Sequence, residues 1–159
     1  MKSLAEILQK KTMIVIGLMS GTSADGMDAA LTEISGSGTN IQVRQRAFVS
    51  LAYSDEERRE ILRLASGREG GSHDLALFSF FLGRVGLNAC LAVCERAGLA
   101  PDAVDLVGSH GQTLWHIPEP ETYLGQPLTA TLQLGEASVI AEGLGCPVVS
   151  DFRVRDMAA

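Results

Sequence analysis

The sequence has little clustered positive charge, few cysteines and no long apolar run. Lys and Arg number 13 against 19 Asp and Glu, so the net charge at pH 7 is −6. The densest basic groups are the short stretches "QKKT" and "RVR". Nucleic acids and anionic membranes bind proteins through clustered basic residues. The charge pattern therefore argues against either of them as the main partner.

The three cysteines, Cys90, Cys94 and Cys146, are odd in number, and their spacing matches no metal site. Cys90 and Cys94 are four residues apart in a helical pattern, so they share one helix face. We expect all three to be small buried core residues. A disulfide framework is not expected, which favours a reducing, cytoplasmic location.

No uninterrupted apolar run approaches the ~18 residues of a membrane-spanning helix, so we expect none. The segment "KKTMIVIGLM" has the basic-then-apolar order of a secretory leader. Its apolar part is short, however, and "SGTSADGMD" follows in place of a small-residue cleavage site. We therefore expect no signal peptide.

The first third of the chain is rich in strand-forming residues. The chain has 159 residues, 46% of them hydrophobic, which suits one domain with a real core. Residues 1–12 have helical spacing of apolar residues and are predicted to be a short amphipathic lead-in. Strands are predicted at residues 13–19, 27–35 and 41–51, the last with alternating Ile41, Val43, Ala47 and Val49. Tight connections between them indicate an antiparallel meander.

The hydrophobic period changes at Ser54, which forms a capping-box pattern with Glu57 and begins a helix over residues 54–65. A long helix is predicted over residues 73–97, ended by Gly98. Its apolar face consists of Phe78, Phe81, Leu82, Val85, Ala89, Ala92 and Val93. Short strands and a helix at about 137–144 follow. The predicted order, β-β-β-α-α-β-β-α-β, indicates an α/β protein in which helices pack on a mixed sheet.

Three predicted strand ends carry polar segments, "MSGTSADGMD", "GSHGQTLWH" and "VVSDFRVRD". In open α/β sheets, ligands gather at one set of strand ends. The three segments are therefore predicted to form one site.

The first polar segment has the composition of an anion-binding turn. Gly21 and Gly26 allow tight backbone geometry and close approach of a ligand. Consecutive peptide N–H groups in such a turn can form a concave anion site. Hydroxyl donors come from Ser20, Thr22 and Ser23.

The carboxylates of the same segment, Asp25 and Asp28, would repel a phosphate unless Mg²⁺ stands between them. The segment is not a Walker loop, because no lysine follows a glycine at the required spacing. On composition alone, an ordinary hairpin is as good an interpretation, since Ser, Gly and Asp are common in turns.

The second segment contains His110, Gln112, Trp115 and His116. No third ligand is spaced with the two histidines, so a metal site is a weak interpretation. Ligand contact or ordering of the loop is favoured for His110. Trp115 is either a platform for sugar stacking or a packing residue.

The third segment contains Asp151, Arg153, Arg155 and Asp156. On an extended backbone, Arg153 and Arg155 would point to the same side. Arginine suits bidentate binding of a carboxylate or phosphate. The alternative is a surface network of aspartates and arginines.

Taken together and in this order, the three segments resemble the anhydro-N-acetylmuramic acid kinase family. The matching stretches are "GLMSGTSADGMDAAL", "GSHGQTLWHIP" and "TLQLGEASVIAEGLGCPVVSDFRVRDMAA". The resemblance implies an actin-like/sugar-kinase (ribonuclease H-like) fold of two lobes with ATP in the cleft between them. It also implies a reaction: opening of 1,6-anhydro-N-acetylmuramic acid by water and phosphorylation of O6 by ATP and Mg²⁺, in cell-wall recycling.

The family pattern also implies roles for individual residues. The ATP phosphate loop would consist of Gly21, Thr22, Ser23, Ala24, Asp25, Gly26, Met27 and Asp28. Asp25 and Asp28 would hold Mg²⁺ through water. The amino-sugar side of the cleft would be lined by His110, Gly111, Gln112, Arg153, Arg155 and Asp156.

The family continues past "RVRDMAA" into a "GGQGAP" turn and carries its catalytic base in a later "D-x-G-P-G" motif. The base is therefore expected beyond Ala159, and residues 13–159 are expected to be the N-terminal lobe of a two-lobe kinase. By themselves they should be inactive, and the resemblance implies a homodimer for the intact protein. Two alternatives are a kinase of the same fold with another acceptor and a non-catalytic nucleotide- or sugar-binding module.

Overall fold

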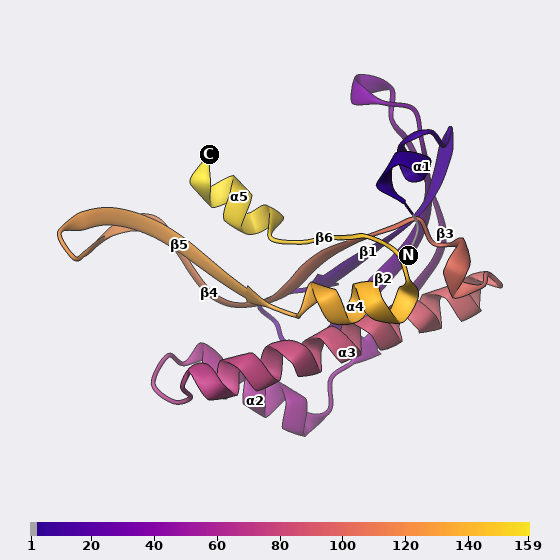
Figure 1. The fold of residues 1–159 in the computed structure, drawn as a ribbon. Coiled ribbons are helices and arrows are strands. Elements are labelled where there is room, and N and C mark those ends of the chain that lie inside the picture. Colours follow the sequence, from indigo (N-terminus) through magenta and orange to yellow (C-terminus); the bar gives the residue numbers. More distant parts are fainter. Residues whose placement is uncertain (1–2) are drawn as a thin grey trace.

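Strands and helices succeed one another along the chain in a mixed α/β arrangement, and the computed structural model describes residues 3–159 (Figure 1). The strands are β1 (Thr12–Ser20), β2 (Gly26–Ser35), β3 (Gln42–Ala52), β4 (Leu106–Tyr123), β5 (Gln126–Leu134) and β6 (Val148–Val149). The helices are α1 (Leu4–Leu8), α2 (Asp55–Ala65), α3 (Ser72–Ala97), α4 (Ala137–Leu144) and α5 (Phe152–Ala158), with short 3₁₀ turns η1 (Gly38–Asn40) and η2 (Pro101–Ala103).

All six strands of the described residues belong to one sheet with the order β3-β2-β1-β4-β5, in which β6 also pairs with β4. The first three strands form the predicted antiparallel meander. β1 and β4 are parallel, whereas β4 and β5 form a long antiparallel hairpin. This mixed sheet confirms the α/β class expected of a sugar-kinase-like lobe. Because β1 and β4 are parallel and Ser20 pairs with Gln112, the segment that follows β1 lies beside the middle of β4.

Helices α3 and α4 cover one face of the sheet (Figure 1). The main core lies between them and the strands, and includes Ile16 and Leu18 of β1. All three cysteines are buried there, as predicted, and burial raises the pKa of the Cys90 thiol. At Gly83 of α3 an added Cβ would lie 2.7 Å from the carbonyl oxygen of Glu136. The small residue therefore lets the two segments approach closely.

A second, smaller core lies where α2 and the N-terminal half of α3 meet β4 and β5. It consists of Ala24, Ile61, Leu64, Phe78, Leu82, Leu114 and Leu134. Ala24 belongs to the connection between β1 and β2. The middle of the first polar segment is therefore anchored in a hydrophobic cluster.

Within the described residues, α3 is long and apolar enough by composition to cross a membrane. The sequence prediction, which considered uninterrupted apolar runs, overlooked this helix. Its buried side, which includes Ala89 and Val93, packs in the main core. Burial against the sheet thus accounts for its apolar composition.

Several local predictions are confirmed. Ser54 and Glu57 form a reciprocal capping box at the start of α2, and Gly98 ends α3 in the left-handed conformation. Of the alternating apolar residues in this part of the chain, Ile41 and Val43 are 53% and 62% exposed. A bulge between Leu31 and Thr32 shifts the pairing of β2 with β3, and the hairpin end projects beyond the helices (Figure 1).

Candidate functional site

The connection between β1 and β2 forms a short loop whose hydroxyl and carboxylate groups face solvent. Thr22, Ser23 and Asp25 are exposed, whereas Ala24 is 1% exposed and has a φ of 50°. The N–H of Ala24 donates to the carbonyl oxygen of Gly21 at 3.2 Å, which closes a tight turn. The loop therefore presents a polar rim over an apolar anchor.

The two glycines of the loop have different roles. At Gly26 an added Cβ would lie 2.5 Å from the backbone oxygen of Leu51, so the absence of a side chain lets β2 pair closely with β3. At Gly21 the nearest atom to an added Cβ would be the Ser23 hydroxyl at 3.8 Å. The space beside Gly21 is thus open, whereas Gly26 and the neighbouring Met27 are buried.

The carboxylate of Asp25 is held in its charged form. The Ser23 hydroxyl donates to it at 2.8 Å and lowers its pKa, and Arg58 of α2 acts in the same direction. Asp28 lies three residues on in β2, paired with Met19 and Ser50, and is half-buried.

No group of three His, Cys, Asp or Glu side chains within residues 3–159 could enclose a metal. Mg²⁺ is commonly held by one or two carboxylates, water and phosphate oxygens, without a full protein cage. An exposed, ionised Asp25 fits that mode, and Asp28 is half-accessible. The donor set is therefore compatible with Mg²⁺ held together with a phosphate.

The sequence predicted that the second polar segment follows the end of a strand. Instead, the segment is part of the continuous strand β4. The pairing of β4 with β1 shifts by one residue between Ser109 and Gln112. Gly111 lies within this bulge with a φ of 74°, and an added Cβ would be 2.7 Å from the oxygen of Leu134. The side chains that face the core change from Val107 and Ser109 to Gln112 and Leu114. Sequence alternation alone does not reveal such a bulge.

The buried Gln112 connects β4 to the loop. Its side chain is 0% exposed. Its Nε2 donates to the carbonyl oxygen of Gly21 at 2.9 Å, and its Oε1 accepts from the Ser20 hydroxyl at 2.6 Å. Ser20 also lies 2.9 Å from the hydroxyl of Tyr53. The substrate contact predicted for Gln112 stays a prediction, while these hydrogen bonds are all internal.

His110 lies on the opposite side of the bulge and is half-buried. Its Nδ1 is 3.0 Å from the carbonyl oxygen of Gly111, and its ring centre is 6.2 Å from that of Phe152. Its Nε2 is buried and has no hydrogen-bond partner in the described chain. A buried imidazole nitrogen without a partner is costly and is commonly satisfied by water or a ligand.

A small polar pocket of about 160 Å³ adjoins His110. It collects residues from α3, the bulge of β4, the end of β5, the start of α4 and the segment before α5. They are Ser79, Ser109, His110, Gly111, Gln133, Leu134, Gly135, Glu136, Ala137, Ser150 and Asp151. The pocket thus joins parts of two of the three polar segments that were predicted to form one site, and contains none of the loop residues 21–28.

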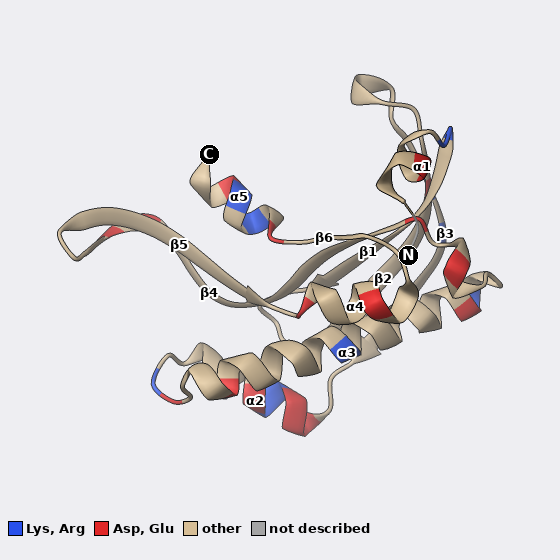
Figure 2. Cartoon of the chain, viewed as in Figure 1, with Lys and Arg blue, Asp and Glu red and all other residues tan. Residues whose placement is uncertain are grey.

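The arginines of the third segment lie on helix α5 and not on extended backbone. In a helix, residues two apart are separated by about 200° around the axis, so the prediction that Arg153 and Arg155 point to the same side is wrong. Arg153 is half-buried, and Arg155 and Asp156 are exposed. Figure 2 shows these charges on the side of the sheet that α3 and α4 leave uncovered. Neither arginine lines the polar pocket.

The remaining residues of the second segment lie farther along the β4–β5 hairpin. His116 is exposed and 3.3 Å from the hydroxyl of Thr131. Trp115 is 45% exposed and packs over Gly67, where an added Cβ would be 3.0 Å from the indole ring. Packing is therefore an observed role of Trp115.

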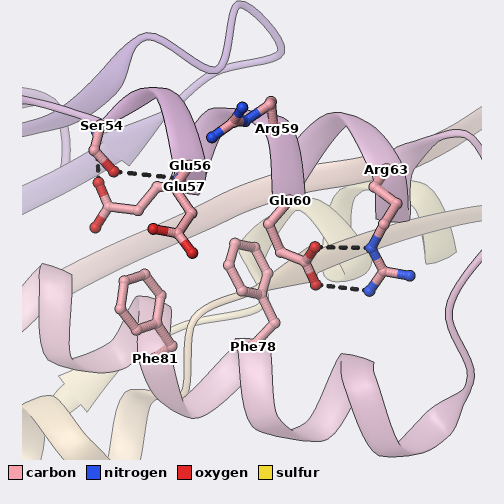
Figure 3. Close-up of a pocket in the computed structure, with 8 residues that line it drawn as sticks. All are labelled: Ser54, Glu56, Glu57, Arg59, Glu60, Arg63, Phe78 and Phe81. Atoms are coloured by element: carbon pink, nitrogen blue, oxygen red, sulfur yellow. Dashed lines mark hydrogen bonds and ion pairs between the residues drawn. The ribbon is translucent and has the colours of Figure 1, made fainter.

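A larger groove of about 640 Å³ lies between α2 and α3 (Figure 3). It contains the Ser54–Glu57 capping box, and Glu60 forms a 2.7 Å ion pair with Arg63 that lowers the pKa of Glu60. No residue of the three polar segments lines it. Of its charged groups, Glu57, Glu60 and Arg63 are engaged in the helix cap and this ion pair.

Sequence reasoning missed three residues of the site: Tyr53, Arg58 and Glu136. The N–H of Tyr53 donates to the carbonyl oxygen of Asp25 at 3.0 Å, and Glu136 caps α4 beside the polar pocket. The capping box predicted where α2 begins. Only the pairing of β2 with β3 brings Tyr53 and Arg58, which lie on either side of Ser54, to the loop.

Comparison with known proteins matches this chain to one family. The sequence model described as anhydro-N-acetylmuramic acid kinase matches residues 13–159. A protein of that name from Caldanaerobacter subterraneus subsp. tengcongensis is 43% identical over 159 residues, which are 100% of this chain and 40% of the relative. A relative of the same name from Salinibacter ruber is 39% identical over 99% of this chain and 40% of its own length. One from Bacillus cereus strain AH187 is 40% identical over 92% of this chain and 38% of its own length.

The chain thus spans about two fifths of the length of the curated relatives that it matches. Among solved structures, one of CasPhi-2 (Cas12j) bound to crRNA and phosphorothioate-DNA aligns with a TM-score of 0.24 and 13% identity, covering 89% of this chain and 26% of that one. That similarity is too low to carry an argument about fold or function. The family match extends over all three polar segments, the exposed loop and the polar pocket. This chain therefore belongs to the anhydro-N-acetylmuramic acid kinase family.

Proposed function

We propose that the intact protein is a cytoplasmic ATP-dependent kinase of cell-wall recycling. It opens the anhydro bridge of 1,6-anhydro-N-acetylmuramic acid with water and phosphorylates O6, to give N-acetylmuramic acid 6-phosphate. The observation that carries the proposal is the loop of residues 21–28, which presents exposed hydroxyls and an ionised carboxylate where the end of β1 pairs with Gln112 in the middle of β4. The family membership of the chain supports the reaction.

In this proposal the loop binds the phosphates of ATP. The backbone N–H groups, among them that of Ser23, and the hydroxyl of Thr22 are the donors, and the open space beside Gly21 receives the ligand. Asp25 and Asp28 hold Mg²⁺ through water. When bound, ATP supplies the phosphoryl group and Mg²⁺ neutralises its charge. Positioning of the phosphates is then the task of this chain.

The polar pocket and α5 would bind the amino sugar. His110 and Gly111 line the pocket, and the unpartnered Nε2 of His110 is available to a polar group of the sugar. Arg155, which is exposed on α5, would hold the lactyl carboxylate, with Arg153 and Asp156 on the same helix. Gln112 is buried and does not line this pocket.

The base that activates the attacking water is expected outside residues 1–159. Phosphoryl transfer also requires a second lobe to close on the nucleotide. We therefore expect residues 1–159 alone to release no ADP from ATP in the presence of the anhydro sugar. A coupled ADP-release assay that found sugar-dependent turnover would contradict this placement of the base.

The phosphate loop is tested in a full-length protein that contains this chain. Asp25→Asn removes the carboxylate and should weaken binding of ATP with Mg²⁺ by about tenfold, which corresponds to ~1.4 kcal/mol. Asp102→Asn is the matched control, because Asp102 is exposed on η2, before the N-terminal end of β4. Calorimetric titration measures both. Unchanged affinity in Asp25→Asn, with the control also unchanged, would refute the loop as the Mg²⁺–phosphate site.

A further inference from the structure

Gln112 is a fully buried polar side chain beneath the loop, and each of its polar groups is engaged. Its Nε2 donates to the carbonyl oxygens of Gly21 at 2.9 Å and Thr113 at 3.0 Å. Its Oε1 accepts from the Ser20 hydroxyl at 2.6 Å. A buried amide is tolerated only when its groups are paired. One side chain of β4 therefore binds the last residue of β1 and the first residue of the loop.

Ser20 extends this network to the other end of the loop. Its hydroxyl lies 2.8 Å from the carbonyl oxygen of Gly26, 2.6 Å from Oε1 of Gln112 and 2.9 Å from the Tyr53 hydroxyl. A serine hydroxyl has one proton, so it donates to one of the two carbonyl oxygens at a time and accepts from Tyr53. Both ends of the loop are thus tied to one buried cluster, Ser20, Tyr53 and Gln112.

The bond to Gly21 sets the direction of a peptide group in the loop. The carbonyl oxygen of Gly21 accepts from Nε2 of Gln112 and from the N–H of Ala24, both on the inner side. In a trans peptide the C=O and the following N–H point in opposite directions. Holding the Gly21 oxygen inward therefore directs the N–H of Thr22 outward, toward the exposed rim.

We propose that Gln112 is a positioning residue for phosphate binding, which aims the Thr22 N–H at the nucleotide through its bond to the Gly21 oxygen. The proposal rests on the proposed function, in that the loop of residues 21–28 binds phosphate. Gln112 itself touches no ligand in this role. The bulge at Gly111 contributes to this positioning, because it turns Gln112 toward the core.

The test uses Gln112→Glu in a full-length protein that contains this chain. This change keeps the length of the side chain but places an oxygen where Nε2 donates to Gly21, so the Gly21 oxygen keeps only the bond from the Ala24 N–H and faces a second oxygen. Gln112→Met, of similar volume and without polar groups, is a second variant in case the carboxylate prevents folding. Gln45→Glu, an exposed glutamine on β3, is the matched control for the added charge. The probes are ATP with Mg²⁺ and adenosine, titrated at a temperature at which each variant is folded.

Gln112→Glu and Gln112→Met should weaken ATP binding tenfold or more, while the affinity for adenosine and the behaviour of Gln45→Glu stay as in the parent protein. A purely structural role would lower the melting temperature and leave the ratio of ATP to adenosine affinity unchanged, and that outcome overturns the proposal. If the parent protein binds ATP no more tightly than adenosine, the phosphate loop itself is refuted, and the positioning role with it.

Discussion

The substitution Gly111→Ala tests the bulge that organises the site. Gly111 has a φ of 74°, and an added Cβ would meet the backbone oxygen of Leu134 at 2.7 Å. A left-handed conformation costs a non-glycine residue about 1–2 kcal/mol. Relieving an overpacked contact against backbone costs about 1–3 kcal/mol more. Together they should lower the free energy of unfolding by about 2–5 kcal/mol.

Gly108→Ala is the matched control in the same strand. Gly108 is not in the left-handed region, and an added Cβ there would meet no atom within 4 Å. Alanine at such a position changes stability by less than about 1 kcal/mol, because it mainly restricts the unfolded chain. Urea unfolding followed by circular dichroism measures both variants. If Gly111→Ala is no less stable than Gly108→Ala, the assignment of the bulge to Gly111 is wrong.

Three further predictions concern single contacts. Asp105 is 1% exposed and accepts from Lys10 at 2.6 Å and from the N–H of Ile14 at 3.0 Å; Lys10→Ala should cost about 3 kcal/mol in urea unfolding, because it takes the Lys10 ammonium away from a buried carboxylate, and Lys10→Arg, which keeps the charge, should cost less. Equal losses in Lys10→Ala and Lys10→Arg would contradict this role of the charge. Ser54→Ala removes the N-cap of α2 and should lower the free energy of unfolding by about 1 kcal/mol, measured as a fall in the thermal midpoint. Ser54→Asp, which can still cap the helix, should retain most of the parent protein's stability. The pKa of Asp25 is lowered chiefly by the Ser23 hydroxyl, so Ser23→Ala should move it back toward its ordinary value in an NMR titration. Because the pKa of Asp25 is lower in the folded protein than in the unfolded chain, its ionised form stabilises the fold at pH values above the unfolded-state pKa. This stabilisation is lost as the pH falls through the folded-state pKa. If the pKa of Asp25 in Ser23→Ala equals that of the parent protein, the assigned cause is refuted.

Local chemistry in the sequence was sufficient to predict where α2, α3 and α4 lie, but not α5. The pair Ser54 and Glu57 encodes the start of α2, and Gly98 encodes the end of α3. These signals involve residues within one turn of each other, so they do not depend on the rest of the fold. The unusual composition of residues 20–28 likewise marked the loop before its position was known.

Tertiary structure decided which of the polar residues act together. The segment around His110 looks like a turn in sequence, yet its pairing with β1 and β5 makes it strand with a bulge. That bulge, and not the alternation of residues, places Gln112 in the core under the loop. Arg153 and Arg155 lie on a helix, where a two-residue spacing separates side chains that a strand would bring together. The sequence by itself determined the local elements and the chemistry of the loop, because both depend on near neighbours. The face on which each side chain lies depended on pairing between distant strands, and only the folded chain decides it.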